Sequence, residues 1–141
     1  MAAKHILACI DFSEQSSAAL AEVGEYARAN GSKVTLIHIA DPQGFIPPQA
    51  VLEPAVASDR SAHEEQLASL RDTHLAGIPV ELAVIEDHAP ARAICDYARD
   101  HDVDLIMVGS HGRGGMERWL IGSVAERVVR HARSNVYVVR R

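Results

Sequence analysis

The sequence predicts an α/β fold, in which helices cover both faces of one open, mainly parallel five-stranded sheet. Strand-like apolar runs alternate with helix-like segments along the chain, and this alternation is typical of parallel sheets. The runs are apolar almost throughout, as expected of strands that are buried on both faces. The chain has 141 residues, 48% of them hydrophobic and 23% charged, which suits one core and one domain, residues 1–141.

Capping residues and turn residues set the expected element bounds. Ser13 caps the first helix, and Asn30-Gly31 ends it with C-terminal turn chemistry. Pro90 suits the first turn of the third helix, while four prolines make 41–57 the longest irregular segment. The first expected helix ends near residue 30, and the second runs over about 58–75. The third begins at Pro90, and the fourth runs over about 123–131. The expected strands are 4–10, 33–40, 78–86, 104–109 and 135–141.

The sheet order 3-2-1-4-5 is expected, because right-handed crossovers permit it and it makes the first and fourth strands neighbours. In such sheets, ligands bind beyond the carboxyl ends of the strands, where the strand order reverses. Asp11-Phe12-Ser13 follows the first strand, and a glycine-rich loop follows the fourth. The predicted site lies between these two segments.

Composition excludes several classes of protein. The net charge of −5 argues against nucleic-acid binding, and no apolar run approaches the roughly 18 residues of a membrane span. The start of the chain lacks an apolar leader, so we expect a cytoplasmic protein. Cys9 and Cys95 form no CxxC pair and are expected to be buried, reduced thiols. The eight histidines show no metal-ligand spacing; His38, inside an apolar strand, is expected to be a hydrogen-bonded core residue.

The loop after the fourth strand, "VGSHGRGGMERWLIGS", has the spacing Gly109-x2-Gly112-x9-Gly122-Ser123. It matches neither the dinucleotide fingerprint nor the P-loop. Glycines let backbone N–H groups approach a ligand closely, and the following helix presents its N-terminus to an anion. The segment 112–141 carries seven arginines and two glutamates, a local charge of +5 that would help an anion site. The alternative is a long turn in which Ser123 is a simple N-cap.

These residues resemble the universal stress protein family over essentially the full chain. The matching pieces are "KHILACIDFSE", "KVTLIHIAD", "DVDLIMVGSHGRGG", "LIGSVAERVVRHA" and "NVYVVRR". The glycine spacing resembles that of the ATP-binding branch. Where some relatives have Pro-Thr before the aspartate, this chain has Cys9-Ile10. The resemblance implies a nucleotide site at Cys9, Ile10, Asp11, Ile39, Val108, Gly109, Ser110, His111, Gly112, Arg113, Gly122, Ser123 and Val124.

Each part of that site has an alternative reading. Asp11, expected at the ribose or a metal, could simply be a helix-leading carboxylate beside Ser13. His111 is more typical of a loop histidine than of a base. The ligand expected from the resemblance is ATP, or ADP or AMP, with Mg²⁺ or Mn²⁺ carried on the phosphates, and no catalytic residue is assigned.

The resemblance implies a homodimeric regulatory module in the stress response, with an unidentified protein partner. The apolar C-terminal strand is expected to be an edge, and the dimer is predicted to form through Val136, Tyr137, Val138 and Val139. Neither nucleic-acid binding nor membrane insertion is expected. Two alternatives stand: a slow metal-dependent ATPase or phosphotransferase, and a nucleotide-independent interaction protein.

Overall fold

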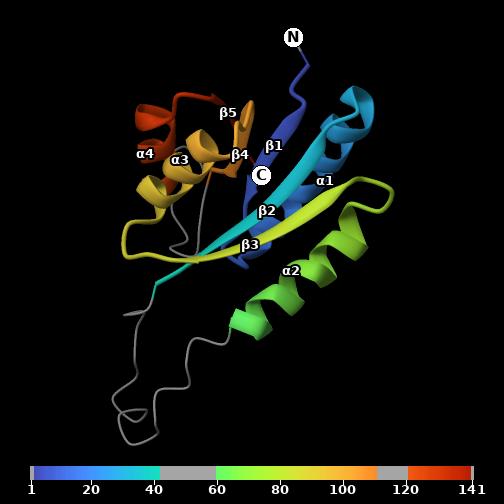
Figure 1. Ribbon diagram of the computed structural model, residues 1–141, viewed down its shortest axis with the longest axis horizontal. Helices are drawn as coiled ribbons and strands as arrows, with labels where there is room; N and C mark the ends of the chain where they lie inside the picture. Colours follow the sequence, from blue (N-terminus) through green and yellow to red (C-terminus); the bar gives the residue numbers. More distant parts are fainter. Residues whose placement is uncertain (1, 42–59, 111–120, 141) are drawn as a thin grey trace, which may run out of the picture.

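Five parallel strands form one sheet in the order β3-β2-β1-β4-β5, which confirms the expected order 3-2-1-4-5 (Figure 1). The computed structural model describes residues 2–41, 60–110 and 121–140. All four strand pairs are parallel, so the carboxyl ends of the strands meet at one edge. The strands are β1 His5–Cys9, β2 Lys33–Ala40, β3 Val80–Glu86, β4 Leu105–Gly109 and β5 Asn135–Val139.

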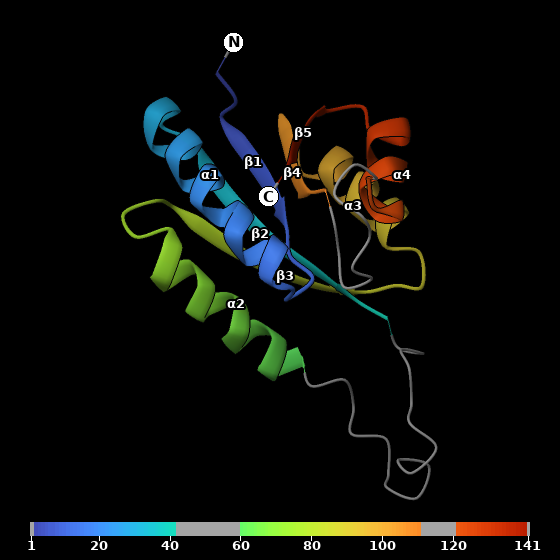
Figure 2. The same ribbon diagram turned by 180° about the vertical axis from the view of Figure 1, so that it is seen from behind.

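Two pairs of helices cover the two faces of the sheet, as Figures 1 and 2 show from opposite sides. Helices α1 (Glu14–Asn30) and α2 (Arg60–His74) cover one face, and α3 (Pro90–Asp100) and α4 (Ser123–His131) cover the other. Side chains of the strands alternate between two apolar clusters, one under each pair. Leu20 of α1 is fully buried in one cluster, and Val128 of α4 is fully buried in the other.

The predicted helix ends are confirmed. The Ser13 hydroxyl accepts a hydrogen bond from the Ser16 amide at 3.1 Å, so it caps α1. Gly31 ends α1 in the left-handed region, with φ of 65°, where a side chain would be strained. Pro90 is the first residue of α3. Each of these positions could be predicted because a single residue type has the required backbone geometry or side-chain acceptor.

Two expectations need correction. The spacing of the apolar residues in the last helix predicts that Val124, Ala125, Val128, Val129 and Ala132 face inward. Val129 is instead 50% exposed, because its neighbour Val128 occupies the inward position and successive helical residues are about 100° apart. The strands are also shorter than expected: β3 begins at Val80, after Pro79, and β5 ends at Val139. Most of the expected irregular segment 41–57 lies outside the described residues. No helix in the described ranges is long and apolar enough to span a membrane.

The start of β1 is tied to both of its neighbours. The Asp104 carboxylate, just before β4, accepts hydrogen bonds from the amides of Lys4 at 3.0 Å and His5 at 2.9 Å. The buried His5 side chain lies 2.8 Å from the Thr35 hydroxyl of β2, Nε2 to Oγ1. These contacts hold the central strand in register with β2 and β4.

His5 makes the stability of the fold depend on pH. Burial, with the nearby Lys33 charge, lowers the pKa of His5 below its ordinary value of 6.5. The unfolded chain therefore binds a proton at a pH where the folded chain does not. We expect the free energy of unfolding to fall as the pH drops below 6.5 and through the lowered pKa. Urea denaturation between about pH 7 and pH 5 measures this slope.

Substitution isolates the contribution of His5. His5→Gln keeps an amide near Thr35 but cannot titrate, so this variant should show a shallower pH slope than the parent protein. His88→Gln is the matched control, because the His88 side chain is 61% exposed. An unchanged slope in His5→Gln would contradict this assignment.

Candidate functional site

The carboxyl ends of β1 and β4 lie side by side at the centre of the sheet. Ala8 is paired with Met107 in this parallel register, so the segments after Cys9 and Gly109 leave the sheet next to each other. Asp11 lies on the first of these segments and Ser110 on the second. The structure thus brings together the two sequence segments that were expected to form the site.

Asp11 is held by the turn that begins α1. Its Oδ1 accepts hydrogen bonds from the Ser13 amide, at 2.9 Å, and from the Ser13 hydroxyl. Phe12, between them, has φ of 62°, which is a strained conformation for a bulky residue. The carboxylate therefore supports the start of the helix, as the alternative reading proposed, and this fixes its position at the sheet edge.

Two short hydrogen bonds hold the end of the glycine segment against the sheet. The Gly122 amide donates to the Ser110 carbonyl at 2.6 Å, and the Ser110 amide donates to the Val139 carbonyl of β5 at 2.9 Å. The start of α4 is thereby fixed beside the carboxyl end of β4. Three residues predicted for the site, His111, Gly112 and Arg113, lie outside the described residues.

Gly122, rather than Ser123, is the N-cap of α4. It has φ of −64° and ψ of 156°, and no side chain caps the helix. Ser123 is the first helical residue and is exposed. The first amides of a helix have no intrahelical acceptor, and among the described residues no side chain caps them either. This end of α4 therefore offers amide donors and a positive dipole end to an anion.

An apolar wall lies on the face of the sheet that α3 and α4 cover. The half-buried side chains of Cys9, Ile39 and Val124 pack against the cluster on this face. Val108 is buried within β4. Ile10 instead packs into the opposite cluster, so only its backbone can contribute to a site here. The wall suits the flat apolar surface of a nucleobase.

Neither thiol is suited to nucleophilic chemistry. Burial raises the pKa of Cys9 to about 12 and also raises the pKa of Cys95, so both thiols are protonated at neutral pH. Within the described residues, no group of three or more His, Cys, Asp or Glu side chains could hold a metal ion. Any metal here would be bound mainly through the ligand.

A cluster of three rings beside Asp11 was not expected from the sequence. Phe12 lies 4.4 Å from His38 and 5.7 Å from His63, between ring centroids. His38 Nδ1 is 2.8 Å from the Ile10 carbonyl, which confirms it as a hydrogen-bonded core residue. Within residues 2–41, 60–110 and 121–140, buried His63 Nδ1 has no hydrogen-bond partner. No local pattern joins these residues, because they come from three separate elements.

Comparison with known proteins is consistent with this geometry. The model of the universal stress protein family matches residues 2–140. A putative universal stress protein of Staphylococcus haemolyticus is 32% identical over 139 residues, which cover 97% of this chain and 84% of that protein. The structure of universal stress protein UspA from Lactobacillus plantarum is 27% identical, covers 97% of both chains and has a TM-score of 0.81.

More distant solved structures share the fold and include nucleotide complexes. A universal stress protein in complex with cAMP is 21% identical, covers 99% of this chain and 98% of its own, and has a TM-score of 0.72. The universal stress protein from Archaeoglobus fulgidus in complex with dAMP is 22% identical, covers 98% of both chains and has a TM-score of 0.66. The family model matches nearly the whole chain. This chain belongs to the universal stress protein family.

Proposed function

We propose that this protein is an ATP-binding regulatory module of the stress response, working as a homodimer. The observation that carries the proposal is the start of α4. It is capped by a glycine, lacks a side-chain cap and is held by Ser110 at the carboxyl edge of the sheet, beside Asp11. Universal stress proteins of the same fold have been solved with cAMP and dAMP, which favours an adenine nucleotide.

The roles of the residues follow from their positions. The amides of Ser123 and Val124 would bind phosphate at the helix N-terminus. Asp11, fixed by Ser13, would contact the ribose or a Mg²⁺ or Mn²⁺ ion carried on the phosphates. Ile39 and Cys9 would lie against the adenine. The intact glycine spacing supports ATP in particular, because it lets the loop backbone approach a polyphosphate.

The donors of this site suit binding better than turnover. Phosphoryl transfer needs a placed metal, an oriented nucleophile and stabilisation of transition-state charge. At the described part of the site, the donors are backbone amides and the carboxylate is engaged by Ser13. We therefore propose that the protein reports the presence of nucleotide to a protein partner.

Gly122→Asp tests the phosphate site at the buried N-cap of α4. Aspartate is a preferred N-cap, so its carboxylate would satisfy the α4 amides while repelling phosphate. We expect ATP with Mg²⁺ to bind nucleotide-stripped protein with micromolar affinity, and the variant to bind at least about tenfold more weakly. Isothermal titration calorimetry measures the affinity, and thermal melting checks that the variant is folded.

Ala76→Asp is the matched control. It adds the same charge at an exposed residue between α2 and β3, at the opposite edge of the sheet, and should leave ATP binding unchanged. Absence of ATP binding in the parent protein would refute the nucleotide proposal and favour a protein that acts through its surface alone. Equal weakening in both variants would show that the effect is only long-range charge.

The edge strand β5 supports the proposed dimer. It pairs with β4 alone, and its sequence is apolar, which favours pairing with another chain. Val136 and Val138 are half-buried within the single chain. Tyr137 is 43% exposed, although its hydroxyl donates to Glu22 at 2.9 Å. A second copy along this edge would cover the remaining apolar surface of Val136–Val139.

Val138→Lys tests this dimer. A lysine in the edge strand should disfavour pairing, and we expect the protein to change from dimer to monomer in light scattering at about 10 μM. Val129→Lys, at an exposed position of α4, should stay dimeric. A monomeric parent protein, or a dimeric and folded Val138→Lys variant, would show that β5 is not the interface.

A further inference from the structure

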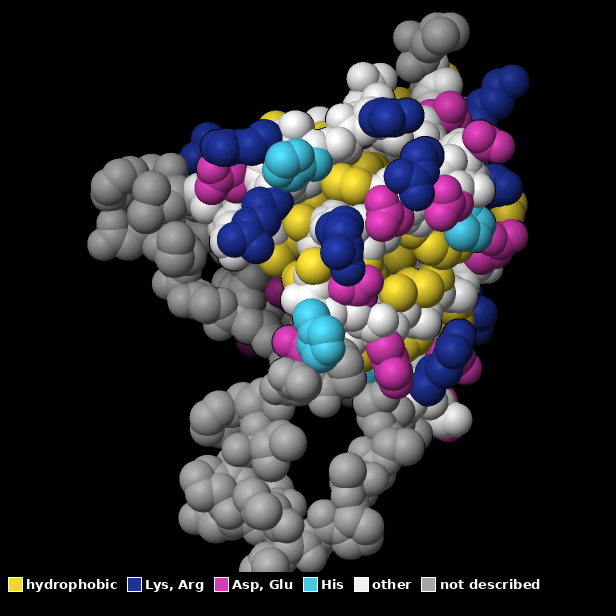
Figure 3. Space-filling view, turned by 60° about the vertical axis from the view of Figure 1, so that its left-hand side comes forward, with side chains coloured by type: hydrophobic (Ala, Val, Ile, Leu, Met, Phe, Trp, Pro, Cys, Tyr) yellow, Lys and Arg dark blue, Asp and Glu magenta, His cyan; other side chains and the backbone are white. Residues whose placement is uncertain are grey.

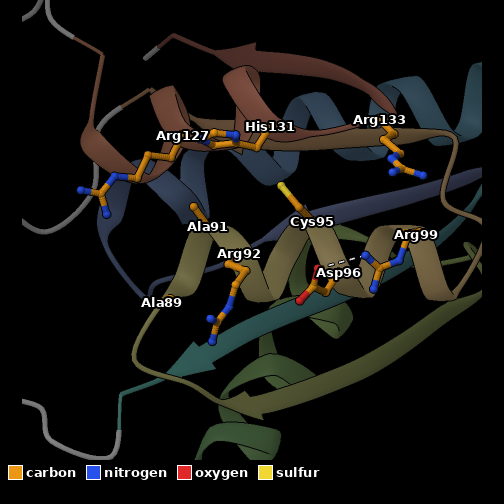
Figure 4. A pocket seen from close by; sticks show the side chains of 9 residues that line it. All are labelled: Ala89, Ala91, Arg92, Cys95, Asp96, Arg99, Arg127, His131 and Arg133. Atoms are coloured by element: carbon orange, nitrogen blue, oxygen red, sulfur yellow. Dashed lines mark ion pairs between the residues drawn. The ribbon is translucent and has the colours of Figure 1, made fainter.

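Helices α3 and α4 enclose a cavity of about 510 Å³ on one face of the molecule. This volume is within the usual range of small-molecule sites. Its lining comes from residues 89–99 and 127–133, and among the described residues it includes none assigned to the nucleotide site (Figure 4). The cavity therefore needs an explanation of its own.

The α4 side of the cavity is cationic and has no counter-charge. Arg127, His131 and Arg133 line it (Figure 4). Within the described part of the chain, none of these three side chains forms an ion pair or a hydrogen bond. Arg130 on the same helix differs, because it is bound to Glu126 at 2.7 Å and does not line the cavity. Arg127 of α4 and Arg133, which follows the helix, thus stand at the cavity with no ion pair among the described residues.

The α3 side adds two more guanidinium groups with weak partners. Arg92 lies 3.4 Å from the Asp87 carboxylate, and Arg99 lies 3.4 Å from Asp96 and 3.1 Å from Asp100. The arginine side chains are 69% and 53% exposed, so each pair contributes little to stability. A multivalent anion between the helices could therefore recruit both arginines at small cost.

Apolar groups lie between the charged side chains. Ala89, Ala91 and Cys95 line the cavity, and the Cys95 sulfur lies between the two helices in Figure 4. Figure 3 shows the same face, where yellow apolar atoms lie among dark blue Lys and Arg, magenta Asp and Glu and cyan His side chains. Asp96 also lines the cavity and lies 3.4 Å from Arg99, so the described lining combines four arginines and a histidine with one carboxylate. This excess of basic groups around an apolar floor suits a small molecule that has an organic body and several anionic groups.

We propose that this cavity is a second ligand site, which binds a small phosphorylated metabolite with at least two phosphate groups. Guanidinium groups bind phosphate through paired hydrogen bonds. Here they stand on both walls, so two phosphates would be held at once. This site is independent of the proposed ATP site, and it concentrates positive charge in a chain whose net charge is −5.

Inorganic pyrophosphate is the probe for a first test. It should be titrated calorimetrically into the full-length Gly122→Asp variant, so that the proposed nucleotide site does not contribute. We expect one site per chain with a Kd below about 1 mM at low salt, weakening as NaCl is added. The double variant Arg127→Gln/Arg133→Gln should bind about tenfold or more weakly.

Arg130→Gln is the matched control and should change the affinity by less than about twofold. The proposal is overturned if pyrophosphate does not bind, if the double variant binds as well as its parent, or if Arg130→Gln weakens binding equally. A hexaglutamate peptide that binds where pyrophosphate does not would also overturn it, in favour of an acidic protein partner.

Cys95 gives a test that needs no ligand. Because burial raises the pKa of Cys95, the alkylation is run at about pH 9, where part of the thiol is ionised. Iodoacetate is anionic and iodoacetamide is neutral, and both alkylate the same thiolate, so the iodoacetate rate divided by the iodoacetamide rate reports the local potential. We expect this ratio at Cys95, measured by peptide mass spectrometry, to fall severalfold, by about 2–5 times, in the double variant. It should be unchanged in Arg130→Gln. An unchanged ratio in the double variant would show that these arginines do not act on the cavity.

Discussion

The parallel pairing of β1 with β4 is the constraint on which the site depends. The chain builds β2 and β3 on one side of β1, and then crosses back to build β4 and β5 on the other. The helices after β1 and β4 consequently cover opposite faces, and the sheet edge between them stays accessible. Asp104 fixes this pairing by accepting hydrogen bonds from the first amides of β1. Without the parallel pairing of β1 with β4, Asp11 and Gly122 would not lie at the same edge of the sheet.

Strand β5 is the proposed dimer interface, and it also holds the backbone of the candidate site in place. Its Val139 carbonyl accepts from Ser110, and the Ser110 carbonyl accepts from Gly122. The backbone that presents the start of α4 is therefore two hydrogen bonds away from the edge strand. A nucleotide that moves Gly122 would also strain the β5 edge, which gives a physical route from occupancy to assembly.

The sequence predicted the fold well because its signals are local. Ser13, Gly31 and Pro90 mark helix ends that depend on one residue each, and buried parallel strands are apolar throughout. Sequence could not place side chains that meet across elements. Phe12, His38 and His63 form one cluster from three elements. The prediction that Val129 of α4 faces inward was also wrong. Two adjacent valines look the same in the sequence, but on a helix they point in different directions, and only Val128 faces the sheet.

For the basic C-terminal segment too, the sequence alone could not show where the charged side chains lie. Its local excess was expected to assist an anion at the glycine segment. In the described part of the chain, however, Arg127 and Arg133 line the cavity between α3 and α4, and Arg130 is neutralised by Glu126. A linear charge count adds these three arginines together, whereas in the structure Arg130 is paired with Glu126 and Arg133 lies beyond the end of α4. The described part of the segment therefore places two of its arginines at the α3–α4 cavity, while Arg113 and Arg118 of the glycine segment lie outside the described residues.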